Sequence, residues 1–225
     1  MTIKFNTAIK AAAVAAALAF SSVGQAASIT GEMPGAVEYL NFDANFFGNI
    51  AVTITPWKFE IGGVETLAFC IDQDTSAVYH VNYGATPVVP SQAIMGLYET
   101  NYKYVLNNGV YNADKAAAFQ LALWELKDDQ SFTNPTGNMV LPLTGGLNPG
   151  NDALAADAYA MLADALNYHG LGGSYLYTEY TAAGTQSLMG VSAVPEADTW
   201  AMMAVGLGLV GLIGRRKSEK SEKFA

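Results

Sequence analysis

The sequence predicts an α+β domain, a β-sandwich or barrel-like sheet with an inserted helical subdomain, flanked by a signal peptide and a C-terminal hydrophobic sorting helix. Three observations carry this prediction. Alternating, β-branched segments fill residues 50–83, helical spacing follows over 91–168, and alternation returns over 174–192. Strands, then helices, then strands indicate a helical insertion in one sheet.

The first strands are predicted around a glycine pair. Ile50–Thr55, Trp57–Ile61 and Val64–Ile71 are rich in β-branched and aromatic residues, which suit a pleated surface. Gly62 and Gly63 separate the last two segments by two residues, the length of a tight hairpin loop. Trp57–Ile61 and Val64–Ile71 are therefore expected to pair.

A further strand is predicted over Ala77–Tyr83, after which the hydrophobic period changes. Helical spacing predicts helices over Ser91–Leu106, Ala113–Lys127 and Asp152–Tyr168. Polar residues suited to N-caps precede or open them: Ser91, Asn112 and Asn151.

The remainder of the domain is a loop followed by more strands. Proline and glycine predict a loop over 132–150. Strands are expected at Ser174–Tyr180 and Thr185–Ser192.

The first 26 residues have the three parts of a signal peptide. Lys4 and Lys10 form a basic start, Ala11–Phe20 is an apolar run too short to span a bilayer, and small residues lead to Ala26. Cleavage is expected after Ala26, so that the chain is exported.

An uncharged segment at residues 199–214 precedes the basic cluster Arg215, Arg216 and Lys217. About 16 to 18 residues at ~1.5 Å each give roughly 25 Å, which reaches across a bilayer core when basic residues extend to the interface. The basic cluster would lie in the cytoplasm, with the domain outside. The segment is thus a predicted transmembrane helix before any processing.

The C-terminal thirty residues resemble a known sorting signal. Val194, Pro195 and Glu196 stand before the hydrophobic segment, and this order, closed by the basic cluster, is similar to the PEP-CTERM signal of Gram-negative bacteria. The resemblance implies an exosortase as partner, transit of the inner membrane, removal of the tail, and delivery to the cell surface or extracellular matrix. It divides the chain into a signal peptide (1–26), an extracellular domain (27–192) and a sorting signal (193–225).

The composition excludes one class of partner. Of 225 residues, 51% are hydrophobic and 14% charged, and the formal net charge is −9. Between the basic ends only four lysines remain: Lys58, Lys103, Lys115 and Lys127. An acidic body repels phosphate, so nucleic acid is not an expected partner.

Two residues are unusual for an exported domain. Cys70 is the single cysteine, and an unpaired thiol is a liability in an oxidising compartment. Gln120 lies on the same helical stripe as Ala116 and Trp124, where the helix should be apolar. A buried amide without partners costs on the order of 1–3 kcal/mol. A bond between Cys70 Sγ and Gln120 Cδ, with loss of ammonia, would remove both anomalies.

The segments around these residues are similar to the two motifs of bacterial Cys-Gln thioester domains. Phe69 precedes Cys70, and Gln120 opens a Gln-x-Ala-aliphatic-Trp run that ends at Trp124. Phe119 stands where the family usually has threonine. The resemblance implies an internal thioester between Cys70 and Gln120.

A thioester reacts with amines and hydroxyls, so the predicted function is covalent attachment to a surface protein or polysaccharide, without turnover and without a cofactor. Three aromatic residues are expected to keep water from the bond: Phe69, Phe119 and Trp124. His80 or His169 would assist transfer to hydroxyls if either lies at the bond. The protein is therefore not expected to be an enzyme.

The sequence was also compared with the requirements of an enzyme, a metal-binding protein and a structural protein. An enzyme would need Cys70 as nucleophile beside His80 or His169, which is no recognised signature. Acidic pairs at Asp72 and Asp74 and at 128–129 lack the glycine and the terminal glutamate of a calcium loop, so no metal site is predicted. The main alternative is a structural protein of the extracellular matrix or biofilm without a reactive thioester.

Overall fold

A computed structural model describes nine parts of the chain: residues 27–33, 36–42, 48–61, 64–72, 75–107, 109–132, 139–140, 152–194 and 205. The chain divides into two units, Met1–Ser192 and Ala193–Ala225. The predicted signal peptide, Pro195, Glu196 and the basic cluster at 215–217 lie outside the described residues. Within the described parts, no helix is long and apolar enough to cross a membrane. Of the segment predicted as a transmembrane helix, 199–214, only Val205 is among the described residues.

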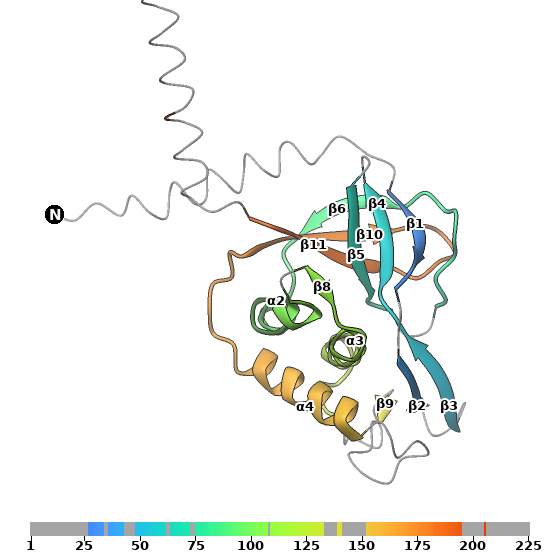
Figure 1. Cartoon of the computed structure of the whole chain (residues 1–225), viewed down its shortest axis with the longest axis vertical. Helices are drawn as coiled ribbons and strands as arrows, with labels where there is room; N and C mark the ends of the chain where they lie inside the picture. Colours follow the sequence, from blue (N-terminus) through green and yellow to red (C-terminus); the bar gives the residue numbers. More distant parts are fainter. Residues whose placement is uncertain are drawn as a thin grey trace, which may run out of the picture. The chain divides into compact units, whose positions relative to one another are not determined.

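The central element of the first unit is a six-stranded antiparallel sheet with the order β1-β4-β5-β11-β10-β6 (Figure 1). Its strands are β1 (Ala27–Glu32), β4 (Trp57–Ile61), β5 (Val64–Cys70), β6 (Gly84–Val88), β10 (Tyr175–Thr181) and β11 (Leu188–Ala193). Ala27 and Tyr83 exchange two backbone hydrogen bonds, and Tyr83 directly precedes β6. The two edges of the sheet therefore meet at one end, which agrees with the predicted barrel-like curvature.

The predicted hairpin is present. β4 pairs with β5 from Trp57 opposite Ala68 to Ile61 opposite Val64. Two smaller sheets complete the strands: β2 (Ala36–Phe42), β3 (Gly48–Ile54) and β9 (Met139–Val140) form one, and β7 (Leu106–Asn107) and β8 (Val110–Tyr111) the other.

The strand predicted over Ala77–Tyr83 is wrong. The chain turns at Tyr79 and His80, with His80 in the left-handed region at φ 60°, and the strand begins at Gly84. The segment alternates because Ala77 and Val81 are partly buried against the core and Tyr83 is buried. In the described part of the chain, its one β-bridge is that of Tyr83 with Ala27.

Three helices occupy the insertion between β6 and β10, as predicted: α2 (Gln92–Val105), α3 (Ala113–Lys127) and α4 (Asp152–Leu166). The Ser91 side chain accepts a hydrogen bond from Ile94 N–H, and Asn112 accepts one from Lys115 N–H, so both predicted N-caps are confirmed. Asn151 lies outside the described residues.

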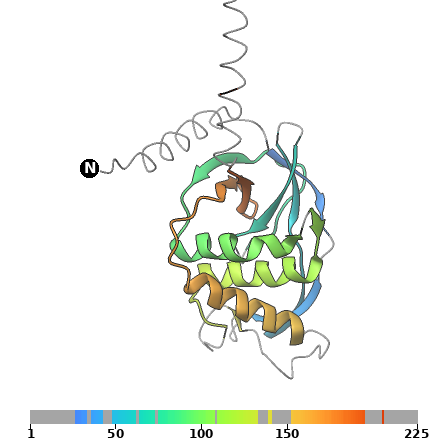
Figure 2. The same ribbon diagram turned by 60° about the vertical axis from the view of Figure 1, so that its left-hand side comes forward.

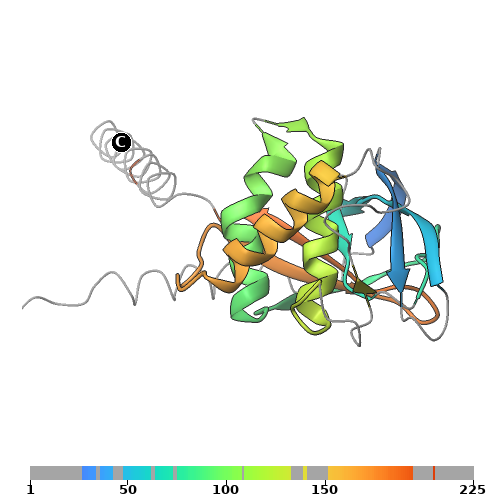
Figure 3. The same ribbon diagram turned by 90° about the horizontal axis from the view of Figure 1, so that it is seen from below.

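Helix α3 is buried on every side. Figures 2 and 3 show α2, α3 and α4 packed against one another, and Figure 1 shows α4 on the side away from the six-stranded sheet. Eleven consecutive residues of α3, from Ala116 to Leu126, are buried. A helix that is apolar all round requires neighbours all round. Any polar side chain between Ala116 and Leu126 must therefore find its partners inside the protein.

Candidate functional site

Cys70 lies at the end of β5, where its backbone polar groups have no strand partner. Ile71 N–H donates to Ser187 O at 3.0 Å, so the backbone of Ile71 points toward the β11 side. Backbone groups alternate in direction along a strand, and the N–H and C=O of Cys70 therefore point away from β11, although Leu188 lies opposite Cys70. On that side the pairing with β4 stops at Trp57, opposite Ala68. The N–H and C=O of Cys70 are thus left for another group.

That group is the Gln120 side chain of α3. Cys70 N–H donates to Gln120 Oε1 at 2.8 Å, and Gln120 Nε2 donates to Cys70 O at 2.7 Å. The carboxamide therefore takes the place of the missing neighbouring strand. Gln120 is 0% exposed, and both bonds together satisfy its buried amide. The two residues on which the sequence prediction rests are brought together.

The Cys70 thiol is nearly enclosed, with 5% of the residue exposed. Trp57 Nε1–H donates to Cys70 Sγ at 3.0 Å. Burial raises the pKa of the Cys70 thiol to about 12, the Trp57 hydrogen bond acts against this rise, and the Asp72 carboxylate adds to it. The free thiol is therefore protonated at neutral pH.

Two of the predicted shielding residues pack against each other. The rings of Phe69 and Phe119 lie 4.8 Å apart, and both residues are 0% exposed. Tyr98 contacts Phe119 edge-on at 4.9 Å, which extends the aromatic layer. Trp124 is buried one turn beyond Gln120 on α3. The shielding roles of Phe69, Phe119 and Trp124 stay predictions.

The sequence analysis did not single out Trp57, which bonds the sulfur, or Tyr79 and Glu32, which lie beside Trp57. Besides Trp57, Tyr79 packs edge-on against the Trp57 ring at 5.3 Å, and Tyr79 donates to Glu32 Oε1 at 2.5 Å. The hairpin register was a usable signal for Trp57. Once Gly62 and Gly63 define the turn, Trp57 falls opposite Ala68 and diagonal to Cys70 on the same face.

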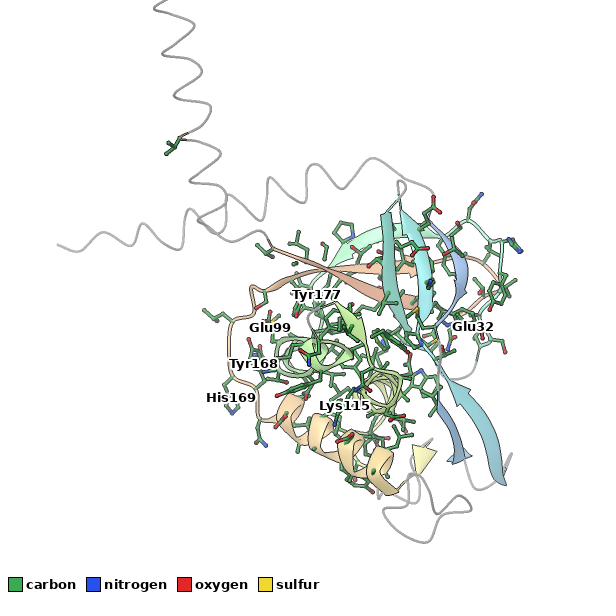
Figure 4. All side chains as sticks on the ribbon, in the orientation of Figure 1. Glu32, Glu99, Lys115, Tyr168, His169 and Tyr177 are labelled. Atoms are coloured by element: carbon green, nitrogen blue, oxygen red, sulfur yellow. The ribbon has the colours of Figure 1, made fainter. Side chains whose placement is uncertain are left out.

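Neither histidine contacts the Cys70–Gln120 pair among the described interactions. His80 is exposed, and its ring lies 6.2 Å from that of Tyr79. His169 is exposed on the far side of the domain from Glu32, the residue that marks the Tyr79–Trp57 end (Figure 4). A role for His80 or His169 at this bond stays a prediction.

The acidic residues fall into two different settings. Asp72 is tied to the segment before β11, because its Oδ2 accepts from Ser187 N–H at 3.0 Å. Asp74 lies outside the described residues. In the described part of the chain, Glu125, Asp128 and Asp129 bring their carboxylate oxygens within 4.8 Å of one another. This is the arrangement that offers ligands to a cation.

Glu125 is the buried member of that cluster. Its Oε1 accepts from Ser131 N–H at 2.6 Å, and Asp129 Oδ1 accepts from the same N–H at 2.9 Å. Burial above all, then the hydrogen bond with Asp129 and the charges of Asp129 and Asp128, raise the pKa of Glu125 to about 8, against the Ser131 bond. The Glu125 carboxyl thus retains its proton at neutral pH.

Several solved structures are similar to this chain at low identity. The N-terminal domain of the Streptococcus pyogenes pilus tip adhesin Cpa aligns with TM-score 0.46 and 12% identity over 78% of this chain and 97% of that one. The thioester domain of the Staphylococcus aureus TIE protein gives 0.45 and 11%, over 74% and 92%. The Bacillus anthracis TIE protein gives 0.43 and 9%, over 77% and 40%.

Sequence comparison adds one match, at the C-terminus. No curated protein matches the chain. Residues 193–217 match the family described as the PEP-CTERM protein-sorting motif, and they include the predicted Val194, Pro195 and Glu196 and the basic cluster. The chain therefore carries a PEP-CTERM protein-sorting motif, the mark of an exported and surface-sorted protein.

Proposed function

We propose that this chain is an exported surface protein in which Cys70 and Gln120 form an internal thioester that an amine or hydroxyl of a target surface attacks. The observation that carries the proposal is the double hydrogen bond between the Gln120 carboxamide and the Cys70 backbone, at 2.8 and 2.7 Å. It holds the electrophilic carbon of Gln120 beside the cysteine, in a site from which water is nearly excluded.

Formation of the bond follows from these contacts. Cys70 Sγ attacks Gln120 Cδ, the C–N bond breaks, and the nitrogen leaves as ammonia with the thiol proton. Only the hydrogen bond from Nε2 to Cys70 O is lost. Cys70 N–H, at 2.8 Å from Oε1, still donates to the acyl oxygen and stabilises the negative charge that develops there.

The bond is used once. An incoming nucleophile takes the acyl group of Gln120, and Cys70 is released as a thiol, so the product is a stable amide or ester crosslink. Nothing regenerates the starting state, and we therefore propose an adhesive crosslinker that is not an enzyme and needs no cofactor. The target is a surface protein or polysaccharide of a neighbouring cell or matrix.

The sorting motif gives the proposed route to that surface. An exosortase of a Gram-negative bacterium would act at residues 193–217 after transit of the inner membrane. The hydrophobic segment would hold the chain in the membrane until this step. The acidic body, with a net charge of −9, gives no reason to expect nucleic acid as the target.

The test is the intact mass of the domain purified without amines. We expect the wild-type protein to weigh one ammonia less than its sequence, and methylamine to add to Gln120 while it frees the Cys70 thiol. Cys70→Ala and Gln120→Ala should have their full calculated masses and take up no methylamine. Gln92→Ala is the matched control, because Gln92 is an exposed glutamine of α2 that bonds Gly170 O.

A different result would favour the alternative function. If the wild-type protein has the unmodified mass and Cys70 reacts at once with a thiol reagent, no thioester exists. The domain would then be better described as a structural component of an extracellular matrix or biofilm.

A further inference from the structure

Trp57 holds a position that bears on how the proposed bond opens. Cys70 makes three described hydrogen bonds, and two of them, through its backbone N–H and C=O, go to Gln120. The third joins Trp57 Nε1–H to Sγ at 3.0 Å. Trp57 therefore donates to the atom that must accept an electron pair when the thioester breaks.

We propose that Trp57 is a catalytic residue of thioester opening, where its indole N–H stabilises the sulfur as the C–S bond breaks. This inference rests on the proposed thioester and adds the group that activates its leaving atom. In the reaction, the amine nitrogen bonds to Gln120 Cδ, and the C–S electron pair moves to Sγ. The amine gives up a proton to solvent, and the sulfur later takes one from solvent.

The donor helps because its bond strengthens during the reaction. A thioester sulfur is a weak acceptor, whereas the departing thiolate carries a full charge, and hydrogen bonds to charged groups are about twice as strong as neutral ones. An interaction that grows between the ground state and the transition state accelerates the step.

The surroundings of the Cys70 sulfur disfavour a thiolate, and a hydrogen-bond donor counters that effect. Burial raises the pKa of the Cys70 thiol to about 12, and the Asp72 carboxylate raises it further, so this sulfur is a poor leaving group by itself. The Trp57 hydrogen bond is the side-chain contact that acts in the opposite direction.

The indole is held in place from its outer side. Tyr79 packs against the Trp57 ring at 5.3 Å with an interplanar angle of 78°, and the Tyr79 hydroxyl donates to Glu32. Glu32 is the strand partner of Trp57 in the β1–β4 pair. Glu32 of β1 and Tyr79 of the turn thus flank the indole whose N–H donates to the sulfur.

The experiment compares methylamine reaction rates, measured by intact mass and by the appearance of free thiol. Trp57→Phe keeps an aromatic ring and removes the N–H. We expect it to retain the thioester and to react on the order of tenfold to a hundredfold more slowly than the wild type. Tyr104→Phe is the control, because Tyr104 is an exposed aromatic residue of α2 with no described contact to Cys70, Gln120 or Trp57. Its rate should stay within about twofold of the wild type.

A second variant tests the same role of the indole N–H if Trp57→Phe folds poorly. Benzothienylalanine at position 57 keeps the bicyclic shape of tryptophan and replaces N–H by sulfur. It should slow the reaction to the same extent.

The outcomes separate the two proposals. A wild-type protein of full mass would overturn the thioester and this inference with it. A wild type that contains the bond, with position 57 variants that react at the wild-type rate, would overturn only the role of Trp57. Folded variants that never form the bond would also overturn it, because the donor is assigned to opening alone.

Discussion

Gln120 and Glu125 lie about one and a half turns apart on the same buried helix, and their polar groups have different partners. Both residues are 0% exposed. The Gln120 amide is neutral at every pH and is satisfied by two hydrogen bonds to Cys70. Glu125 has one backbone donor, from Ser131, and two acidic neighbours.

The difference shows how a protein accommodates a polar group in an apolar helix. An amide needs only matched donors and acceptors, and the unpaired end of β5 supplies one of each. A carboxylate would also carry charge into the interior, so burial raises its pKa and the proton is retained. Gln120 is thus held in one state, whereas Glu125 is titratable. Three predictions follow from this comparison, the largest effect first.

Gln120→Glu should make residue 120 titratable, as Glu125 is. We place it in a Cys70→Ala background, which keeps the backbone N–H and C=O and forms no thioester. A protonated carboxyl can replace the amide, since it also donates and accepts, but an ionised one cannot donate to Cys70 O. We expect the variant to lose about 3 kcal/mol or more of unfolding free energy at pH 8 and clearly less at pH 4. Urea unfolding at both pH values measures this, and an equal loss at both would contradict it.

Glu125→Gln should remove a pH dependence. The pKa of Glu125 is raised from 4.5 to about 8 in the folded protein. Between these pH values Glu125 is protonated in the folded protein and ionised in the unfolded chain. Its contribution to the free energy of unfolding is complete below pH 4.5 and is lost as the pH rises toward 8. The slope approaches about 1.4 kcal/mol per pH unit in this window. We expect the slope to be flatter in Glu125→Gln, as measured by urea unfolding from pH 5 to 9. A parallel wild-type curve would contradict the raised pKa.

Asp129→Asn should have the smallest effect. Asp129 raises the pKa of Glu125 through a hydrogen bond and through its charge, after the larger effect of burial. The variant should move the midpoint of the pH-dependent loss to lower pH without abolishing it. Asp114→Asn is a suitable control, because Asp114 is exposed in the first turn of α3. A shift in the control variant as large as that of Asp129→Asn would exclude a local effect.

Much of the secondary structure could be predicted because its causes are local. Ser91 and Asn112 cap the helices that they were predicted to cap, since capping needs only the first turn. The glycine pair at 62–63 predicted that Trp57–Ile61 and Val64–Ile71 pair, for the same reason, and β4 pairs with β5. The segment 77–83 failed because alternation reports which side chains are buried and does not show whether a ladder partner exists.

The sequence by itself determined which residues could react: a single cysteine, and a glutamine on an apolar helical stripe. It also determined the sorting motif, which is read as a linear segment. Only the tertiary structure decided that Cys70 and Gln120 meet, because their contact depends on β4 pairing no further than Trp57 and on α3 packing beneath the open end of β5. The same is true of Glu125, whose pKa depends on burial by elements distant in sequence, and of Trp57, whose indole reaches the sulfur across the hairpin.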